Sequence, residues 1–252
     1  MTPLIAVAHG SRDPRSARTM RAVAERVRAA CPGLDVRLGF LDLSEPLLDT
    51  VIDDLAAAGC RRAVAVPLLL GDAYHSRVDL PALLAAAEAR HPGIELRQAG
   101  VLGTDPRLVH AVRDRLAEAG AAPDDPGLGI ALAAVGSSRP AANATARALA
   151  PTLRLGTRWA AVRTCFATTD PSVESATAAL HAAGAARIAV GSWFLAPGLL
   201  TDRVRQRALE GTPDTVCAEP IGAHPLLAEV VLDRYRAALR DGVRRDAVAL
   251  TA

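Results

Sequence analysis

The chain of 252 residues contains no lysine, and all 29 of its basic residues are arginine. A phosphate-binding loop that relies on lysine and a catalytic lysine that forms a Schiff base are therefore both excluded. Arginine still permits bidentate binding of carboxylates, so anionic ligands stay open. The same bias is typical of a GC-rich genome, and we take that as its main cause.

Aromatic residues are also scarce, at 3% of the sequence, whereas hydrophobic residues make up 50%. The core must therefore consist mostly of alanine, valine and leucine. The four cysteines form no C-x-x-C pair and no zinc-ribbon spacing, so we expect small buried thiols in a reducing compartment. The formal net charge is only +2, which gives no electrostatic case for a nucleic-acid partner.

Long hydrophobic runs are missing as well. No stretch approaches the roughly 18 apolar residues that a membrane-spanning helix needs. The first residues contain no basic leader, and the apolar run over 4–8 is too short for a signal peptide. The sequence therefore predicts a soluble cytoplasmic protein without a membrane partner.

Short apolar runs alternate with helical patterns along the first half of the chain. The pattern predicts strands over 4–8, 36–41, 63–70 and 94–99. Helices are expected to begin near prolines at positions 14, 46, 81 and 106. The Pro/Gly/Asp-rich segment 120–127 is typical of a linker. Strands that alternate with helices require parallel pairing with right-handed crossovers.

The same order then begins again. Gly136–Pro140 matches Gly10–Pro14 at a distance of 126 positions, and three further segments repeat in the same order. We therefore expect an α/β fold of two tandem doubly wound units with parallel four-stranded sheets, residues 1–125 and 126–252, and an active cleft between them. Ligands of such folds bind beyond the carboxyl ends of the strands.

Candidate functional side chains follow three strands of the first copy. His9 comes directly after the first strand, Asp42 after the second, and His75 lies in the loop after the third. Imidazoles with a carboxylate suit a borderline divalent metal, and the imidazoles could also accept protons from a substrate. The alternatives are a surface or turn role for each histidine, a turn cap for Asp42, and a helix start for Glu45.

The second copy lacks every one of these candidate ligands. His9 corresponds to Val135, Asp42 aligns near Ala167, and His75 falls opposite Leu199 or Thr201. We expect His224, which precedes a proline, to lie at a helix N-cap. The second copy does keep small and polar residues at this edge, which could hold a ligand: Ser137, Ser138, Arg139, Thr168, Thr169 and Arg203.

Two segments carry a family resemblance. Ala8–Pro14, which reads AHGSRDP, resembles the opening motif of the sirohydrochlorin chelatase family, and Pro67–Pro81 resembles its second motif, including the histidine. The segment Phe40–Leu43 falls where that family often has an acidic residue, commonly glutamate. The resemblance spans almost the whole chain, since the family includes long members with two tandem units.

The resemblance implies a class II chelatase, a lyase that inserts Fe²⁺ or Co²⁺ into a sirohydrochlorin-type tetrapyrrole without ATP, in siroheme or cobalamin biosynthesis. His9 and His75 would bind the incoming metal and accept the pyrrole protons. Asp42 would stand in place of the family's carboxylate, one methylene shorter than glutamate. The divalent metal would be a substrate, with no prosthetic group.

Substrate-binding residues are expected in both copies: Ser11, Arg12, Arg77, Ser137, Ser138 and Arg139. The tandem copy predicts that a monomer suffices, and a homodimer is the alternative. Two other functions stay open at this point. One is a non-catalytic carrier of metal or tetrapyrrole, and the other is a hydrolase using Ser11 with His9, which lacks a G-x-S-x-G elbow.

Overall fold

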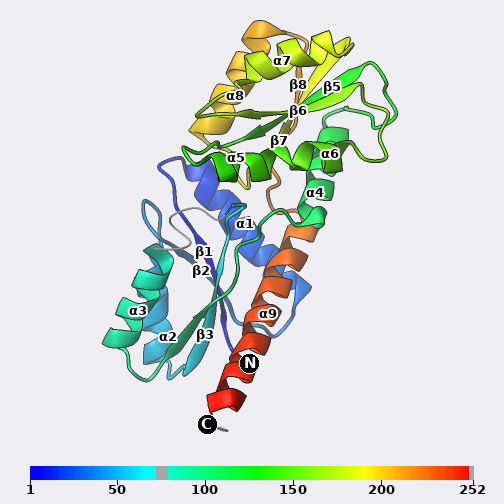
Figure 1. Cartoon of the computed structure of the whole chain (residues 1–252). Coiled ribbons are helices and arrows are strands. Elements are labelled where there is room, and N and C mark those ends of the chain that lie inside the picture. The colour runs from blue at the N-terminus through cyan, green and yellow to red at the C-terminus, as the bar shows by residue number, and fades with distance from the viewer. Residues whose placement is uncertain (72–78, 250–252) are drawn as a thin grey trace. The chain divides into compact units, whose positions relative to one another are not determined.

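Two parallel four-stranded sheets form the framework of the structure, a computed structural model that describes residues 1–71 and 79–249 (Figure 1). The strand order is β2-β1-β3-β4 in the first sheet and β6-β5-β7-β8 in the second. The alternation of strands and helices predicted this fold class, and the structure confirms it. The chain divides into two compact units, which we call unit 1 and unit 2.

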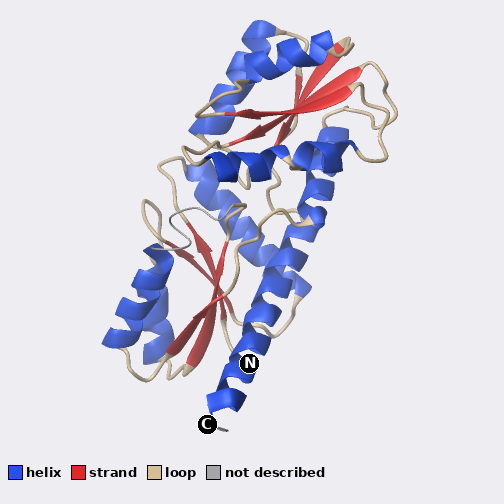
Figure 2. Cartoon of the chain, viewed as in Figure 1, coloured by secondary structure: helices blue, strands red, loops and turns tan. Residues whose placement is uncertain are grey.

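Unit 1 comprises Met1–Gly103 and Ala223–Ala252. Helices α2 and α3 cover one face of its sheet, and α1 and α9 cover the other (Figure 2). Its elements are β1 (Leu4–Ala8), α1 (Pro14–Ala30), β2 (Val36–Phe40), α2 (Leu48–Ala57), β3 (Arg62–Pro67), α3 (Leu80–Arg90), β4 (Glu95–Gln98) and α9 (Pro225–Ala249).

Strand β1 shows why the sequence folds this way. All five of its residues are apolar, and each is at most 3% exposed, because helices bury both faces of the central strand. On one face, Ile5 and Val7 pack with Ile52 and Leu84 in a single hydrophobic cluster. The chain leaves β1 at the sheet's carboxyl edge, which therefore lies above a rigid core.

Unit 2 comprises Thr104–Gly222. Helices α7 and α8 cover one face of its sheet, and α4, α5 and α6 lie on the other. Its elements are α4 (Pro106–Glu118), β5 (Leu128–Ala134), α5 (Pro140–Arg147), α6 (Leu149–Arg154), β6 (Ala161–Phe166), α7 (Val173–Ala182), β7 (Arg187–Ser192), α8 (Leu199–Gly211) and β8 (Val216–Cys217).

The compact units differ from the expected halves 1–125 and 126–252 by one helix each. Helix α4 belongs to the first sequence copy but packs in unit 2, where Arg113 donates hydrogen bonds to the carbonyls of Thr152 and Leu153. Helix α9 belongs to the second copy but packs in unit 1, where Arg234 donates to the carbonyls of Val101 and Leu102. Each sheet is thus covered by a helix from the other copy.

The segment 120–127 is not the linker that its composition indicated. It lies inside unit 2, where Ala121 is buried and the Trp159 indole donates a hydrogen bond to the Ala122 carbonyl. An ion pair between Arg187 and Asp125 also anchors it. The chain passes between the units at Gly103–Thr104 and at Gly222–Ala223 instead.

Two smaller expectations also need adjustment. Helix α2 begins at Leu48 rather than at Pro46, because the Pro46 carbonyl accepts a hydrogen bond from the Phe40 amide and Leu47 bridges to β2. All four cysteines are free thiols as expected, but only Cys165 is fully buried.

Among the described residues, none of the helices has the length and apolar character that a bilayer crossing requires.

Candidate active site

His9 and Asp42 are adjacent at the carboxyl edge of unit 1. Beyond the last paired residues of β1 and β2, the Asp42 amide donates a hydrogen bond of 3.0 Å to the His9 carbonyl. Both side chains are exposed. The backbones of two candidate ligands that are 33 positions apart in the sequence therefore meet at this edge, and their joint role in metal binding stays a prediction.

Gly10 allows this close approach. Its φ of +97° is unfavourable for residues with a side chain, and a Cβ atom at this position would lie 1.6 Å from the Asp42 carbonyl oxygen. The loops after β1 and β2 therefore cross in direct backbone contact, and only glycine fits at the crossing.

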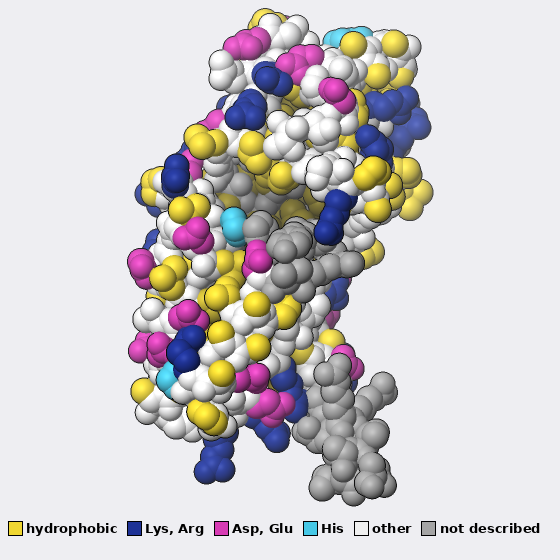
Figure 3. Space-filling view, turned by 60° about the vertical axis from the view of Figure 1, so that its left-hand side comes forward, with side chains coloured by type: hydrophobic (Ala, Val, Ile, Leu, Met, Phe, Trp, Pro, Cys, Tyr) yellow, Lys and Arg dark blue, Asp and Glu magenta, His cyan; other side chains and the backbone are white. Residues whose placement is uncertain are grey.

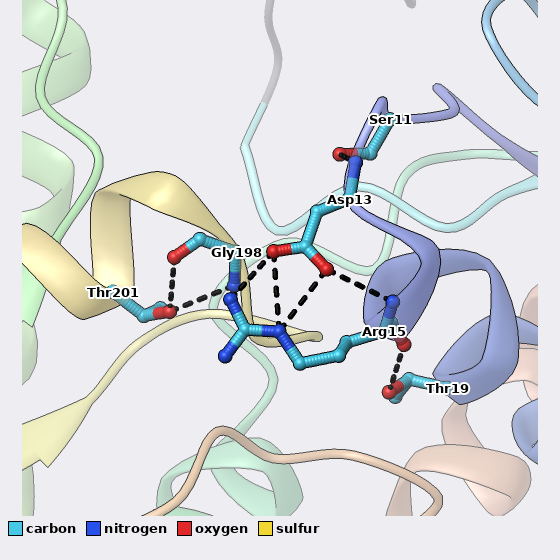
Figure 4. Close-up of polar contacts among 6 residues, drawn as sticks. All are labelled: Ser11, Asp13, Arg15, Thr19, Gly198 and Thr201. Atoms are coloured by element: carbon cyan, nitrogen blue, oxygen red, sulfur yellow. Dashed lines mark hydrogen bonds and ion pairs between the residues drawn. The ribbon is translucent and has the colours of Figure 1, made fainter.

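The next residues organise the start of α1 (Figure 4). The Ser11 hydroxyl accepts a hydrogen bond from the Asp13 amide at 3.1 Å. Asp13 is the N-cap of α1: its carboxylate accepts from the Arg15 amide at 2.9 Å and pairs with the Arg15 guanidinium. These bonds to Arg15 hold the pKa of Asp13 below its ordinary value. Ser11 thus has a structural role at the edge of the site.

The neighbouring acidic groups make local contacts. The Asp42 carboxylate accepts a hydrogen bond of 2.7 Å from the Leu43 amide, and Leu43 has a φ of +59°. The Glu45 carboxylate accepts from the Leu47 amide at 3.1 Å, just ahead of α2. This contact favours the role of Glu45 at a helix start.

His75 and Arg77 lie outside the described residues. Within the ranges 1–71 and 79–249, no group of three or more histidine, cysteine, aspartate or glutamate side chains is arranged to hold a metal ion. The described part of the candidate ligand set is therefore the pair His9 and Asp42, and the third ligand remains a prediction from the sequence.

The carboxyl edge of unit 2 has the same backbone without these ligands. The Thr168 amide donates a hydrogen bond of 3.1 Å to the Val135 carbonyl, in the manner of Asp42 and His9. Thr168 is therefore the backbone counterpart of Asp42, one residue beyond the Ala167 position indicated by the sequence alignment. Its hydroxyl donates to the same Val135 carbonyl at 2.8 Å.

The turn in which a serine hydroxyl accepts a hydrogen bond from the amide two residues later, which we call the serine turn, is also present in unit 2. The Ser137 hydroxyl accepts a hydrogen bond from the Arg139 amide at 3.1 Å, as Ser11 does from Asp13. Ser138 and Arg139 are exposed beside it. Because Arg139 occupies the position of the N-cap Asp13, unit 2 presents a cation where unit 1 presents a carboxylate paired with arginine.

Two side chains that sequence reasoning missed hold these turns. The Ser44 hydroxyl accepts from the Ser11 amide at 3.2 Å and donates to the Ser11 carbonyl at 3.1 Å. In unit 2, the Asn143 side-chain oxygen accepts from the Ser137 amide and its nitrogen donates to the Ser137 carbonyl, both at 2.8 Å. A polar residue on the buried face of α5 was the available signal for Asn143, which is 8% exposed.

Unit 2 exposes aliphatic side chains at Val135, the counterpart of His9, and at Leu199, one of the two residues expected opposite His75. Val135 is 45% exposed and Leu199 is 73% exposed. Leu199 starts α8, where the Thr201 hydroxyl bonds both the amide and the carbonyl of Gly198 (Figure 4). The predicted N-cap role of His224 is confirmed, since its Nδ1 accepts from the Leu226 amide at 3.3 Å, ahead of α9.

On the face shown in Figure 3, arginine and acidic side chains are interspersed with apolar ones. Among the cysteines, burial raises the pKa of Cys165 to about 12, so this thiol stays protonated and is a poor metal ligand at neutral pH.

Comparison with known proteins extends the resemblance to both units. The model of the CbiX family matches residues 3–119 and 129–238. A sirohydrochlorin ferrochelatase of Bacillus subtilis is 24% identical across 92% of this chain and 90% of its own length. A sirohydrochlorin cobaltochelatase of Methanopyrus kandleri is 30% identical and spans 47% of this chain and 97% of its own length.

Solved structures share the fold. SirB from Bacillus subtilis with Fe³⁺ superposes with a TM-score of 0.79 at 24% identity, covering 94% of this chain and 96% of SirB. CbiX from denitrifying bacteria, described as the terminal enzyme for biosynthesis of siroheme, gives a TM-score of 0.67 at 23% identity and covers 94% of this chain and 99% of its own. With a family model that matches nearly the whole length of both copies, the chain belongs to the CbiX family.

Proposed function

We propose that this protein is a class II sirohydrochlorin chelatase, which inserts Fe²⁺ or Co²⁺ into a sirohydrochlorin-type tetrapyrrole without ATP. The observation that carries the proposal is the pair His9 and Asp42 at the carboxyl edge of unit 1, in a chain whose family and curated relatives are chelatases. Relatives of both metal types match, so the proposal covers iron and cobalt.

The reaction requires a site that holds a metal weakly and accepts protons. Insertion of a divalent metal releases two pyrrole protons, and imidazole has a pKa close to neutrality. His9 and His75 therefore bind the metal and take up the protons, and Asp42 contributes a carboxylate oxygen. Two imidazoles and one carboxylate leave coordination positions open for the macrocycle nitrogens.

Residues of both units are proposed to bind the tetrapyrrole. Its carboxylates suit the exposed guanidinium groups of Arg12 and Arg139. Its flat apolar ring suits exposed aliphatic groups such as Val135 and Leu199. The remaining proposed contacts are Ser11, Arg77, Ser137 and Ser138.

A spectroscopic assay tests the proposal. Purified protein is mixed with excess sirohydrochlorin and either Fe²⁺ or Co²⁺, and the absorbance change of metal insertion is followed. Many turnovers per chain support the enzyme, whereas conversion that stops after one equivalent indicates a carrier. Absence of conversion with both metals contradicts the proposal.

Substitution of the histidines assigns the site. His9→Ala and His75→Ala are each expected to lower kcat by about 10²- to 10⁴-fold, the usual contribution of a general base, with unchanged circular dichroism. His181→Ala is the matched control, because His181 is exposed in the last turn of α7, which leads to the amino end of β7. Full activity of either site variant would contradict the assignment of His9 and His75 to the site.

A further inference from the structure

The loops after β1 and β2 are joined by a side-chain clamp that the proposed chemistry does not itself use. Ser44, in the second loop, bonds both backbone polar groups of Ser11, in the first loop, at 3.2 and 3.1 Å. Ser11 lies two residues after His9, and Ser44 lies two residues after Asp42. The clamp therefore spans the two loops that carry the proposed ligands.

A second contact of the same loops restricts how they can move. Gly10 passes so close to the Asp42 carbonyl that a Cβ atom would overlap it, and the Asp42 amide donates to the His9 carbonyl at 3.0 Å. The loops thus meet at three consecutive places, through His9, Gly10 and Ser11. Of the contacts described, the one at Ser11 is made by a side chain, the Ser44 hydroxyl.

Unit 2 shows that the serine turn itself does not require a clamp between loops. Asn143 makes the same pair of bonds to Ser137, but it does so from α5, six positions further along the same segment. This clamp ties the turn to its own helix. The loop after β6 instead reaches the loop after β5 through Thr168, whose amide and hydroxyl both donate to the Val135 carbonyl. In unit 2 the residue at the His9 position is Val135, so there is no ligand pair to align.

We propose that Ser44 is a positioning residue, which aligns His9 with Asp42 for metal binding by fixing the loop after β1 against the loop after β2. This proposal rests on the proposed function for its chemistry. Side chains that orient metal ligands typically change metal affinity or activity by about 10- to 100-fold when they are removed. The loss of Ser44 is expected to fall at the lower end of that range, because the backbone contacts at His9 and Gly10 remain.

The test compares Ser44→Ala, Ser44→Thr and Asn143→Ala by titration with Co²⁺ alone. Ser44→Ala is expected to weaken Co²⁺ binding about 10-fold and to lower kcat for insertion similarly, with an unchanged KM for the tetrapyrrole. Ser44→Thr keeps the hydroxyl and is expected to restore both values. Asn143→Ala, which breaks the clamp of unit 2, is expected to leave Co²⁺ affinity unchanged.

A readout independent of metal is the hydrogen exchange of the Asp42 amide. Its acceptor, the His9 carbonyl, is intact in Ser44→Ala, so about 10-fold faster exchange would report that the loops have separated. Unchanged exchange and Co²⁺ affinity in Ser44→Ala would overturn the proposal, as would an equal loss of Co²⁺ affinity in Asn143→Ala. If the wild-type protein inserts no metal, the proposed function fails, and the exchange of Asp42 still decides whether Ser44 holds the loops.

Discussion

In unit 1 the residue that follows the first strand is His9, and in unit 2 the residue in the same backbone position is Val135. The amides of Asp42 and Thr168 donate equivalent hydrogen bonds to these two residues, and Ser11 and Ser137 form equivalent turns. The edge of each sheet is thus shaped by backbone groups and small polar residues. Its shape is independent of the ligands, so the fold by itself does not identify which unit handles metal.

The largest expected difference between the units concerns Gly10 and its counterpart in unit 2, Gly136. In Gly10→Ala the new Cβ would meet a backbone oxygen at 1.6 Å, whereas in Gly136→Ala it would meet side-chain atoms of Thr168 and Thr169 at 2.9 Å. We expect Gly10→Ala to lower the free energy of unfolding by more than about 3 kcal/mol and Gly136→Ala by about 1–2 kcal/mol.

Urea denaturation measures both losses. Gly93→Ala is the control, since a Cβ atom at Gly93 would meet no atom within 4 Å. Equal losses for Gly10→Ala and Gly136→Ala would show that the two crossings are equally tolerant and would remove this difference between the units.

An effect of intermediate size is expected at Arg139, the exposed cation in the position of Asp13. If unit 2 binds a substrate carboxylate, Arg139→Ala removes a charge-assisted hydrogen bond and raises the KM for the tetrapyrrole about 10-fold, with kcat little changed. Steady-state kinetics measure this split. Arg158→Ala is the control, because Arg158 is exposed ahead of β6, at the opposite end of the same sheet. An unchanged KM in Arg139→Ala would contradict the assignment.

The smallest effect is a pH dependence at the N-cap of α1, where unit 2 has Arg139 in place of Asp13. The side-chain and backbone hydrogen bonds from Arg15 lower the pKa of Asp13 from its ordinary value of 3.8. Because the pKa is lower in the folded state, this carboxylate stabilises the protein above pH about 4, and the contribution is lost as the pH falls through the folded value.

Asp13→Asn is therefore expected to flatten the decrease of Tm in acid below pH about 4, since asparagine can still cap α1 but does not titrate. Thermal melts of the wild-type and variant proteins, followed by circular dichroism from neutral pH into acid, measure the slopes. Identical acid slopes would show that the pair with Arg15 contributes no pH-dependent stability.

Much of the fold followed from the sequence, because strand runs such as Leu4–Ala8 and helix starts such as Asp13–Pro14 are local signals. The packing of α4 in unit 2 could not be predicted from the sequence. Its apolar stripe, which includes Val112 and Leu116, could cover any sheet of small residues, and only the tertiary structure shows that it packs on Gly191 of β7.

Part of the candidate site could also be predicted from the sequence. The rule that ligands lie beyond the carboxyl ends of parallel strands pointed to His9 and Asp42, and their backbones meet at that edge, while their role as ligands stays a prediction. Ser44 was not identified, because its partner Ser11 is 33 positions away and its hydrogen bonds are to backbone atoms, which leave no pattern of residue types.

Helix α4 of the first copy packs in unit 2 and helix α9 of the second copy packs in unit 1, and this arrangement affects the order in which the units are completed during synthesis. Unit 2 is one continuous segment, Thr104–Gly222, whereas unit 1 needs both Met1–Gly103 and α9, which begins at Pro225. Since domains fold as units while the ribosome proceeds from the N-terminus, unit 2 has all of its residues available before unit 1 does. The unit that carries His9 is therefore the last to be closed, and a chain that stops before Pro225 lacks the helix that covers one face of its sheet.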